Sequence, residues 1–146
     1  MSSDERELLQ MELKMLKEAG EVLEYSYNTC NSIGLNKRHT FAEMDKFEAL
    51  TSRFARTSDI MVQKIFRLID AVELELPGSV IDRINRAEKR GDISSAETFR
   101  EIRRLRNDIA HEYILESIDQ LYKKAMELTP DLLDSVNKVI EVYSDK

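Results

Sequence analysis

The sequence predicts an all-α protein with a single domain over residues 1–146, built as an antiparallel four-helix up-and-down bundle with one or two additional short helices. Three observations favour this fold class. The chain contains only 4 Gly and 2 Pro among 146 residues, too few for a β fold with many turns. Apolar residues recur every three or four positions over long stretches. Most of these stretches follow a Ser or Thr with an acidic residue three positions later, a pattern that begins helices.

The first helix is expected to begin at Ser2 or Ser3 and to run to about Asn31. Its apolar positions alternate steps of four and three, as in a helix packed nearly antiparallel to a neighbour: Leu9, Leu13, Leu16, Gly20, Leu23, Tyr27 and Cys30. Cys30 is the only cysteine, so it is interpreted as a small buried hydrophobe and not as a nucleophile. Residues 33–39 form the following turn.

The second helix is expected to begin with the capping box Thr40-x-x-Glu43 and to reach about Glu75. Two apolar stripes run along it, so two of its faces should be packed. A polar patch interrupts its middle and includes Arg53, Arg56 and Asp59. The patch is either plain surface or the lining of a cleft, where these three residues would steer and orient a phosphate group.

The segment Leu76-Pro77-Gly78-Ser79 should break the second helix. A short third helix then follows from the capping box Ser79-x-x-Asp82 and ends near Gly91.

Ser94-x-x-Glu97 is expected to cap the fourth helix, whose amphipathic pattern continues to about Leu128. Thr129-Pro130-Asp131 then resembles the start of a last helix, with a cap, a proline in the first turn and an acidic residue.

The net charge of −6 and the pI of about 5.1 argue against a general polyanion binder, and DNA is not expected as a partner. The charge is uneven, however. Residues 1–32 carry seven acidic against three basic residues, whereas residues 81–106 carry eight basic against five acidic ones. The basic segment is either a solvated helix face or a nucleic-acid contact.

No apolar run approaches the roughly 18 residues of a membrane span. The N-terminal residues are acidic and lack the apolar core of a signal peptide. These features predict a cytoplasmic protein that does not enter a membrane.

The fourth helix carries the pattern Arg-x4-His-x-Tyr, formed by Arg106, His111 and Tyr113. It places a guanidinium, an imidazole and a phenol within about two helical turns. Cleavage of RNA without a metal needs a base, a cation that stabilises the phosphorane, and an acid. His111 is the candidate base, Arg106 the candidate phosphate ligand, and Asn107 the residue that orients the imidazole.

Helical geometry constrains how these side chains meet. Arg104, Asn107 and His111 share one face, whereas Arg106 and Tyr113 lie about 140° round the helix from His111. Arg106 and His111 can meet only if the arginine side chain curls round the helix, if the helix is irregular there, or if a second subunit supplies part of the site. We therefore expect the site to open onto a cleft across the two-fold axis of a homodimer, where the second subunit's histidine supplies the acid.

The segment Leu105–Tyr113 resembles the signature of the HEPN domains, and the tyrosine two residues after the histidine is typical of the HepT-like toxins. The resemblance implies a homodimeric, metal-independent RNA endonuclease that needs no cofactor. It implies a type VII-like toxin–antitoxin pair, in which a minimal nucleotidyltransferase antitoxin, MntA-like, transfers AMP from ATP to the tyrosine. Arg106 and His111 would be catalytic, Asn107 supporting, and Tyr113 both supporting and the site of modification.

Three other interpretations stay open. The same residues would suit a non-catalytic nucleotide- or substrate-binding subunit of a small nucleotidyltransferase. A metal-carboxylate bundle needs repeated Glu-x-x-His pairs, and Asp108-x-x-His111 is the only comparable spacing. In a helical adaptor, Arg106 would be solvated, Asn107 and His111 a local polar pair, and Tyr113 a packed ring.

Overall fold

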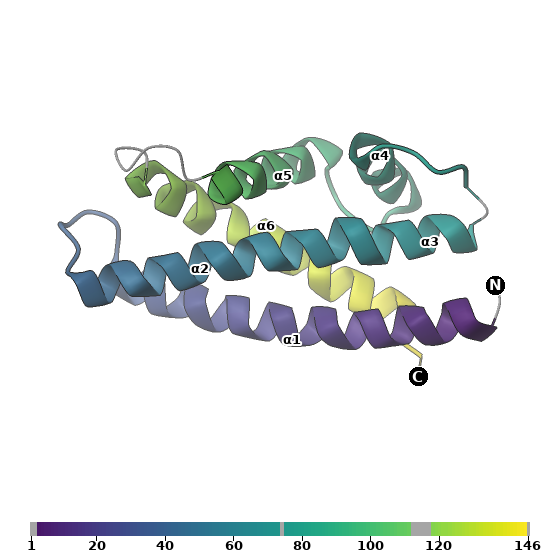
Figure 1. Cartoon of the computed structure of the whole chain (residues 1–146), viewed down its shortest axis with the longest axis horizontal. Helices are drawn as coiled ribbons and strands as arrows, with labels where there is room; N and C mark the ends of the chain where they lie inside the picture. Colours follow the sequence, from purple (N-terminus) through teal and green to yellow (C-terminus); the bar gives the residue numbers. More distant parts are fainter. Residues whose placement is uncertain (1–2, 74, 112–117, 146) are drawn as a thin grey trace.

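The computed structural model describes residues 3–73, 75–111 and 118–145, and in these ranges the protein is all-helical (Figure 1). This confirms the predicted all-α class. The helical elements in chain order are α1 (Ser3–Ile33), α2 (Phe41–Asp59), the π-helix η1 (Ile60–Ile65), α3 (Phe66–Val72), α4 (Val80–Arg90), α5 (Ala96–His111) and α6 (Ile118–Tyr143).

The long helices pack round one apolar core. Helix α1 lies along the rod formed by α2, η1 and α3, while α4 and α5 lie on the other side of that rod (Figure 1). Helix α6 packs against α1, α2 and α5. The largest fully buried side chains are aromatic and aliphatic: Phe47, Phe54, Phe66, Phe99, Leu16, Leu23, Leu50, Met61, Ile65, Ile69, Ile84 and Ile102. Their burial is the main stabilising contribution to the fold.

The first helix ends at Ile33, two residues beyond the predicted end, and Gly34 follows it with a φ of 83°. Cys30 is buried, as expected for a small hydrophobe, and its thiol donates to the Lys46 carbonyl at 3.4 Å. Burial raises the pKa of Cys30 to about 11, so the thiol is protonated at neutral pH.

The predicted second helix begins as expected but is not uniform. Thr40 and Glu43 form a complete capping box at its start. The α-helix gives way to a π-helix at Ile60, and the last α segment ends at Val72, three residues before the predicted end at Glu75. A single-residue insertion of this kind rotates the downstream helix by about 100°. The spacing of apolar residues did not predict the π-helix, because apolar residues continue before and after it.

Helix α4 confirms the predicted short helix. Ser79 and Asp82 form its capping box, and Gly91 ends it in the left-handed conformation with a φ of 84°. Its arginines bind back to α3, since Arg86 and Arg90 donate to the two oxygens of Asp70 at 3.2 and 2.6 Å.

Helix α5 begins one residue later than predicted. The Thr98 amide donates to the Ser95 hydroxyl at 3.1 Å, so Ser95 and not Ser94 acts as the cap. The reason is a tertiary contact: the Ala96 amide donates to the Glu88 carboxylate of α4 at 2.6 Å. That contact satisfies an amide of the first turn from outside the helix.

The prediction of one helical pattern from Ser94 to about Leu128 was wrong. Helix α5 ends at His111 and α6 begins at Ile118, and the two helices pack against one another with opposite directions, so they are not one continuous helix (Figure 1). Residues 112–117, over which the predicted pattern also ran, lie outside the described residues.

The prediction that a new helix begins at Thr129 was also wrong, because α6 runs without interruption through Pro130. The proline cannot donate to the carbonyl four residues earlier. Burial of the flanking residues Ala125, Leu132 and Val136 offsets that loss. The Thr129 hydroxyl donates to the Ala125 carbonyl at 2.6 Å, which satisfies a buried hydroxyl next to the proline.

None of the helices in the described ranges combines the length and the apolar character that crossing a membrane requires.

Candidate functional site

Helix α5 supplies the candidate site because its two faces differ. Phe99, Ile102, Leu105 and Ile109 are buried on the face turned to the core. Of the basic residues between them, Arg103 and Arg106 reach Asp59 at the end of α2, Arg100 reaches Asn85 of α4, and Arg104 is exposed. The amphipathic spacing therefore fixes which guanidiniums can reach α2.

Arg106 forms a bidentate ion pair with Asp59, the last residue of α2. Arg106 Nε donates to Asp59 Oδ1 at 2.6 Å and Nη2 donates to Oδ2 at 3.0 Å. The two side chains keep 30% and 35% of their surface exposed, so the pair is fixed and remains accessible. Two parallel hydrogen bonds hold the plane of a guanidinium in one orientation.

A second arginine, Arg103, binds the same carboxylate. Its Nη1 donates to Asp59 Oδ1 and to the Ser58 hydroxyl, both at 2.9 Å, and its side chain is only 11% exposed. Arg103 was not among the predicted site residues. Its position three residues before Arg106, on the same side of α5, was the available signal.

The electrostatics of this cluster follow from one carboxylate between two cations. Burial alone would raise the pKa of Asp59, but the hydrogen bonds and charges of Arg106 and Arg103 outweigh it and hold that pKa below its usual range. The hydrogen bond to Asp59 raises the pKa of Arg106 further. One positive charge of the three-residue cluster is therefore not neutralised.

Asn107 lies beside Arg106 and accepts a long hydrogen bond of 3.4 Å from Arg106 Nη1. Arg104, Asn107 and His111 are all exposed, in agreement with their predicted common face. His111 is the last residue of α5. Arg106 is directed to Asp59, so its guanidinium is set by α2 and not by curling round α5 toward the histidine.

The other two members of the predicted polar patch have different positions. Arg53 donates to the Ser26 hydroxyl of α1 at 2.7 Å and to the Val22 carbonyl at 3.5 Å, so it links α1 to α2. Arg56 is exposed. Of the three residues proposed for steering, the structure brings only Asp59 to Arg106.

Tyr113, the predicted site of modification, lies outside the described residues. The second histidine, His39, does lie within them: its Nε2 is 2.8 Å from the Gly34 carbonyl, and its ring packs on Phe47 with 4.7 Å between ring centroids. His39 thus has a structural environment in the turn between α1 and α2.

A hollow of about 260 Å³ lies between that turn and the start of α6. It is lined by Leu35, Asn36, His39, Asp119, Gln120, Tyr122 and Lys123. Pockets for small molecules commonly have at least about 300 Å³. The hollow is therefore small for a whole nucleotide.

Within residues 3–73, 75–111 and 118–145, no group of three or more His, Cys, Asp or Glu side chains is arranged to hold a metal ion. The described residues thus offer no ligand set for the metal-carboxylate alternative.

Comparison with known proteins adds no relative: no family model, curated protein or solved structure matches the chain.

Proposed function

We propose that this protein is a metal-independent RNA endonuclease of the HEPN type, in which Arg106 and His111 of α5 act on one phosphodiester. The observation that carries the proposal is the bidentate pair of Arg106 with Asp59. A guanidinium that is fixed by a carboxylate, yet 30% exposed, suits a phosphorane better than a freely rotating arginine does. His111 is exposed five residues further along α5 but about 140° round it, so the phosphodiester would lie in a cleft that both side chains face.

The reaction follows from these two groups. His111 takes the proton of a ribose 2′-hydroxyl, and the 2′-oxygen attacks the adjacent phosphorus. Arg106 stabilises the charge that develops on the phosphate oxygens. The bond from phosphorus to the 5′-oxygen breaks, and that oxygen takes a proton, which the second subunit's histidine supplies in a two-fold site. The products are a 2′,3′-cyclic phosphate and a 5′-hydroxyl.

Regulation is part of the proposal. A partner nucleotidyltransferase, the MntA-like antitoxin, transfers AMP from ATP to the Tyr113 hydroxyl and releases pyrophosphate. Tyr113 is two residues beyond His111 in the sequence. A nucleotide attached there adds bulk and negative charge next to the base, which blocks entry of RNA. The pair would act as a toxin and its antitoxin.

The test is cleavage of labelled RNA by the purified protein in EDTA, with analysis of the product ends. The wild type is expected to cut and to leave 2′,3′-cyclic phosphates. His111→Ala should lower the rate by about 10²–10⁴-fold, the usual contribution of a general base. Arg106→Ala should lower it by about 10²–10³-fold, as for other lost oxyanion ligands.

The matched control is His39→Gln, which changes the only other histidine. A glutamine amide can still donate to the Gly34 carbonyl, so this variant should fold and cut as the wild type does. Equal cutting by His111→Ala and the wild type would contradict the proposal.

The second candidate is a non-catalytic binding subunit of a small nucleotidyltransferase. The hollow between the α1–α2 turn and α6 favours it, although its volume of about 260 Å³ suits only part of a nucleotide. This candidate predicts no RNA cleavage by the wild type. It also predicts a change in nucleotide binding on Lys123→Ala, measured by calorimetry.

A further inference from the structure

Four arginines on α3, α4 and α5 have no ion pair with a described carboxylate, and three of them, all but the exposed Arg104, lie on the side of α5 and α4 that leads to α3. Arg67, Arg83 and Arg100 have no Asp or Glu oxygen within 4.0 Å among the described residues. Arg67 is exposed, and Arg83 and Arg100 are half-buried. We refer to these three residues as the arginine track.

Neighbouring arginines show that the chain can neutralise cations where it has carboxylates. Asp70 receives both Arg86 and Arg90, at 3.2 and 2.6 Å. Asp59 likewise receives Arg103 and Arg106. Arg67, Arg83 and Arg100 thus keep their charge next to arginines that are neutralised.

Two of the track arginines are held by amides instead. Arg83 Nη1 donates to Gln63 Oε1 at 2.9 Å, and Arg100 Nη1 donates to Asn85 Oδ1 at 3.0 Å. An amide oxygen orients a guanidinium but leaves its full charge and its other donors available. Such an arrangement stabilises a binding position for an anion, since fixed guanidiniums lose little entropy when the anion arrives.

The track begins beside the candidate site. Arg100 precedes Arg103 by one turn of α5, and its hydrogen bond crosses to Asn85 of α4. Arg83 lies two residues before Asn85 on α4, and its hydrogen bond to Gln63 joins α4 to η1.

Arg67 follows Gln63 by four residues and completes the series on α3. The π-helix contributes to this alignment. In a regular α-helix, the side chains of Asp59 and Arg67 would be about 80° apart round the helix axis. The one residue that the π-helix inserts reduces this angle to about 20°. Asp59 and Arg67 can therefore face the same side of the rod.

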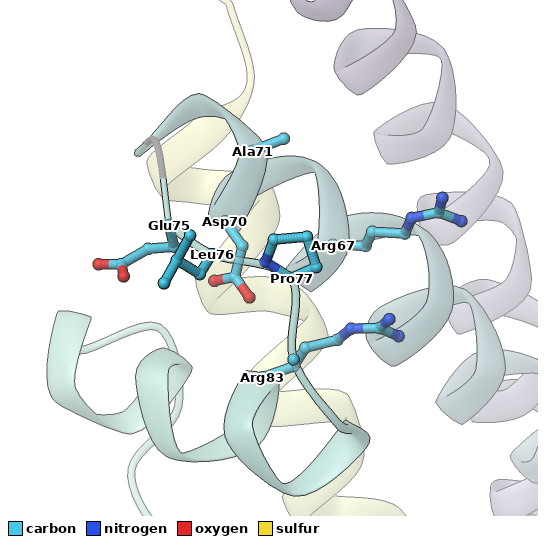
Figure 2. Close-up of a pocket in the computed structure, with 8 residues that line it drawn as sticks. Arg67, Asp70, Ala71, Glu75, Leu76, Pro77 and Arg83 are labelled. Atoms are coloured by element: carbon cyan, nitrogen blue, oxygen red, sulfur yellow. The ribbon is translucent and has the colours of Figure 1, made fainter.

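The track ends at a hollow of about 230 Å³ that Arg67 and Arg83 line from α3 and α4. Figure 2 shows both guanidiniums extending to the same side, while the carboxylate of Glu75 points to the opposite side. Leu76 and Pro77 give the hollow an apolar wall, and the carboxylate of Asp70, which also lines it, is neutralised by Arg86 and Arg90. This combination fits a phosphate next to an unpaired base or ribose.

We propose that the arginine track binds successive backbone phosphates of a single-stranded RNA whose scissile bond lies at Arg106. The inference rests on the proposed function and adds to it how substrate is held outside the cleavage site. Phosphates offset the mutual repulsion of the guanidiniums. The apolar wall favours a single strand, because the bases of a duplex are paired and stacked.

The test measures how RNA binding depends on salt. The ligand is a single-stranded oligonucleotide with methylated 2′-oxygens, which cannot be cut through a 2′-hydroxyl. Each phosphate contact in a single strand contributes about 0.7 to the slope of log K against log salt concentration. This slope is negative, and each of the variants Arg67→Gln, Arg83→Gln and Arg100→Gln should reduce its magnitude by about 0.7.

Two further variants keep every arginine and change only its partner. Gln63→Glu and Asn85→Asp place a carboxylate at the present hydrogen-bond positions of Arg83 and Arg100. They strengthen local pairing, so the fold and the urea midpoint should be retained. Each should nevertheless reduce the magnitude of the salt slope by about 0.7, as removal of the arginine does. Lys138→Gln, an exposed charge on α6, is the control and should leave the slope unchanged.

The proposal would be overturned if all five track variants kept the wild-type slope. It would also be overturned if Lys138→Gln reduced the magnitude of the slope as much as the track variants do. Binding of a duplex with the same slope changes would overturn the assignment to a single strand. Failure of the proposed function gives a different result: the wild type would cut no RNA, while the track variants would still reduce the magnitude of the slope.

Discussion

Asp59 determines where two arginines of α5 lie. It is the one carboxylate shared by Arg103 and Arg106, which are both on α5, while Asp59 ends α2. Loss of this carboxylate would free the Arg106 guanidinium to rotate, and it would also remove a negative charge next to the proposed phosphate position. Catalysis and binding should therefore respond in opposite directions.

For Asp59→Asn we expect kcat for RNA cleavage to fall by about ten-fold or more, since fixed orientation is lost. The affinity for a non-cleavable RNA should be unchanged or higher. The unfolding free energy should fall by about 1 kcal/mol, because the ion pair is partly exposed and screened by solvent. Single-turnover cleavage, RNA titration and urea unfolding measure the three quantities.

Asp108→Asn is the control, because Asp108 is an exposed carboxylate on the same helix. It should leave kcat unchanged. A wild-type kcat in Asp59→Asn would show that the pair does not position Arg106.

Among the helices, α6 contains a proline in its interior, a position that an α-helix disfavours. Pro130 is exposed within the helix and leaves the Met126 carbonyl without its usual amide donor. Helix α6 persists there because its other face is buried against α1, α2 and α5. Packing thus outweighs a local penalty of up to about 3 kcal/mol.

Pro130→Ala should therefore raise the unfolding free energy by about 1–2 kcal/mol. It restores an amide donor, and part of that gain is offset because the unfolded chain becomes less constrained. Urea unfolding measures the change, with Asp131→Ala as a control at the neighbouring exposed position. A lower stability than the wild type would indicate that the packing of α6 requires a bend at the proline.

At the scale of the whole molecule, an ion-pair network joins the C-terminal end of α6 to α3 and α4. The Tyr143 hydroxyl donates to Asp92 Oδ1 at 2.6 Å, and Arg90 Nε donates to Asp92 Oδ2 at 2.8 Å. Arg90 continues the network to Asp70. Burial and the neighbouring Asp92 carboxylate raise the pKa of Tyr143, so its hydroxyl stays a donor at all moderate pH values.

Asp92→Ala should lower the unfolding free energy by about 3 kcal/mol, since it removes a carboxylate that is only 3% exposed and leaves Arg90 Nε and the Tyr143 hydroxyl without their shared acceptor, while Arg90 Nη1 keeps Asp70. Tyr143→Phe, in which Arg90 still holds Asp92, should cost about 1 kcal/mol. Urea unfolding of both variants tests the ranking. Equal losses would mean that the carboxylate contributes no more than the hydroxyl.

The acid sensitivity of the fold should include a contribution from Glu43 at the start of α2. The hydrogen bond from Lys37 and the Thr40 amide lower the pKa of Glu43 to about 2. In the unfolded chain the pKa of glutamate is about 4.3, so the folded form binds this proton less readily. The stabilisation is complete above about pH 5 and is lost as the pH falls toward 2.

Glu43→Gln isolates this charge, because glutamine also completes a capping box. We expect the wild type to be the more stable protein at pH 7, and the difference in thermal midpoint should shrink as the pH is lowered from 5 to 2. An unchanged difference over that range would contradict the assignment.

The all-α class, the capping boxes at Thr40 and Ser79, and the helix that carries Arg106 and His111 could all be predicted from the amino-acid sequence. These features depend on hydrogen bonds and apolar spacing within a few residues. The pairing of Arg106 with Asp59, 47 positions away, and the continuation of α6 through Pro130 could not be predicted and depend on tertiary packing. Such contacts depend on how helices are placed against one another, and burial at those contacts outweighs the local preferences that a sequence displays.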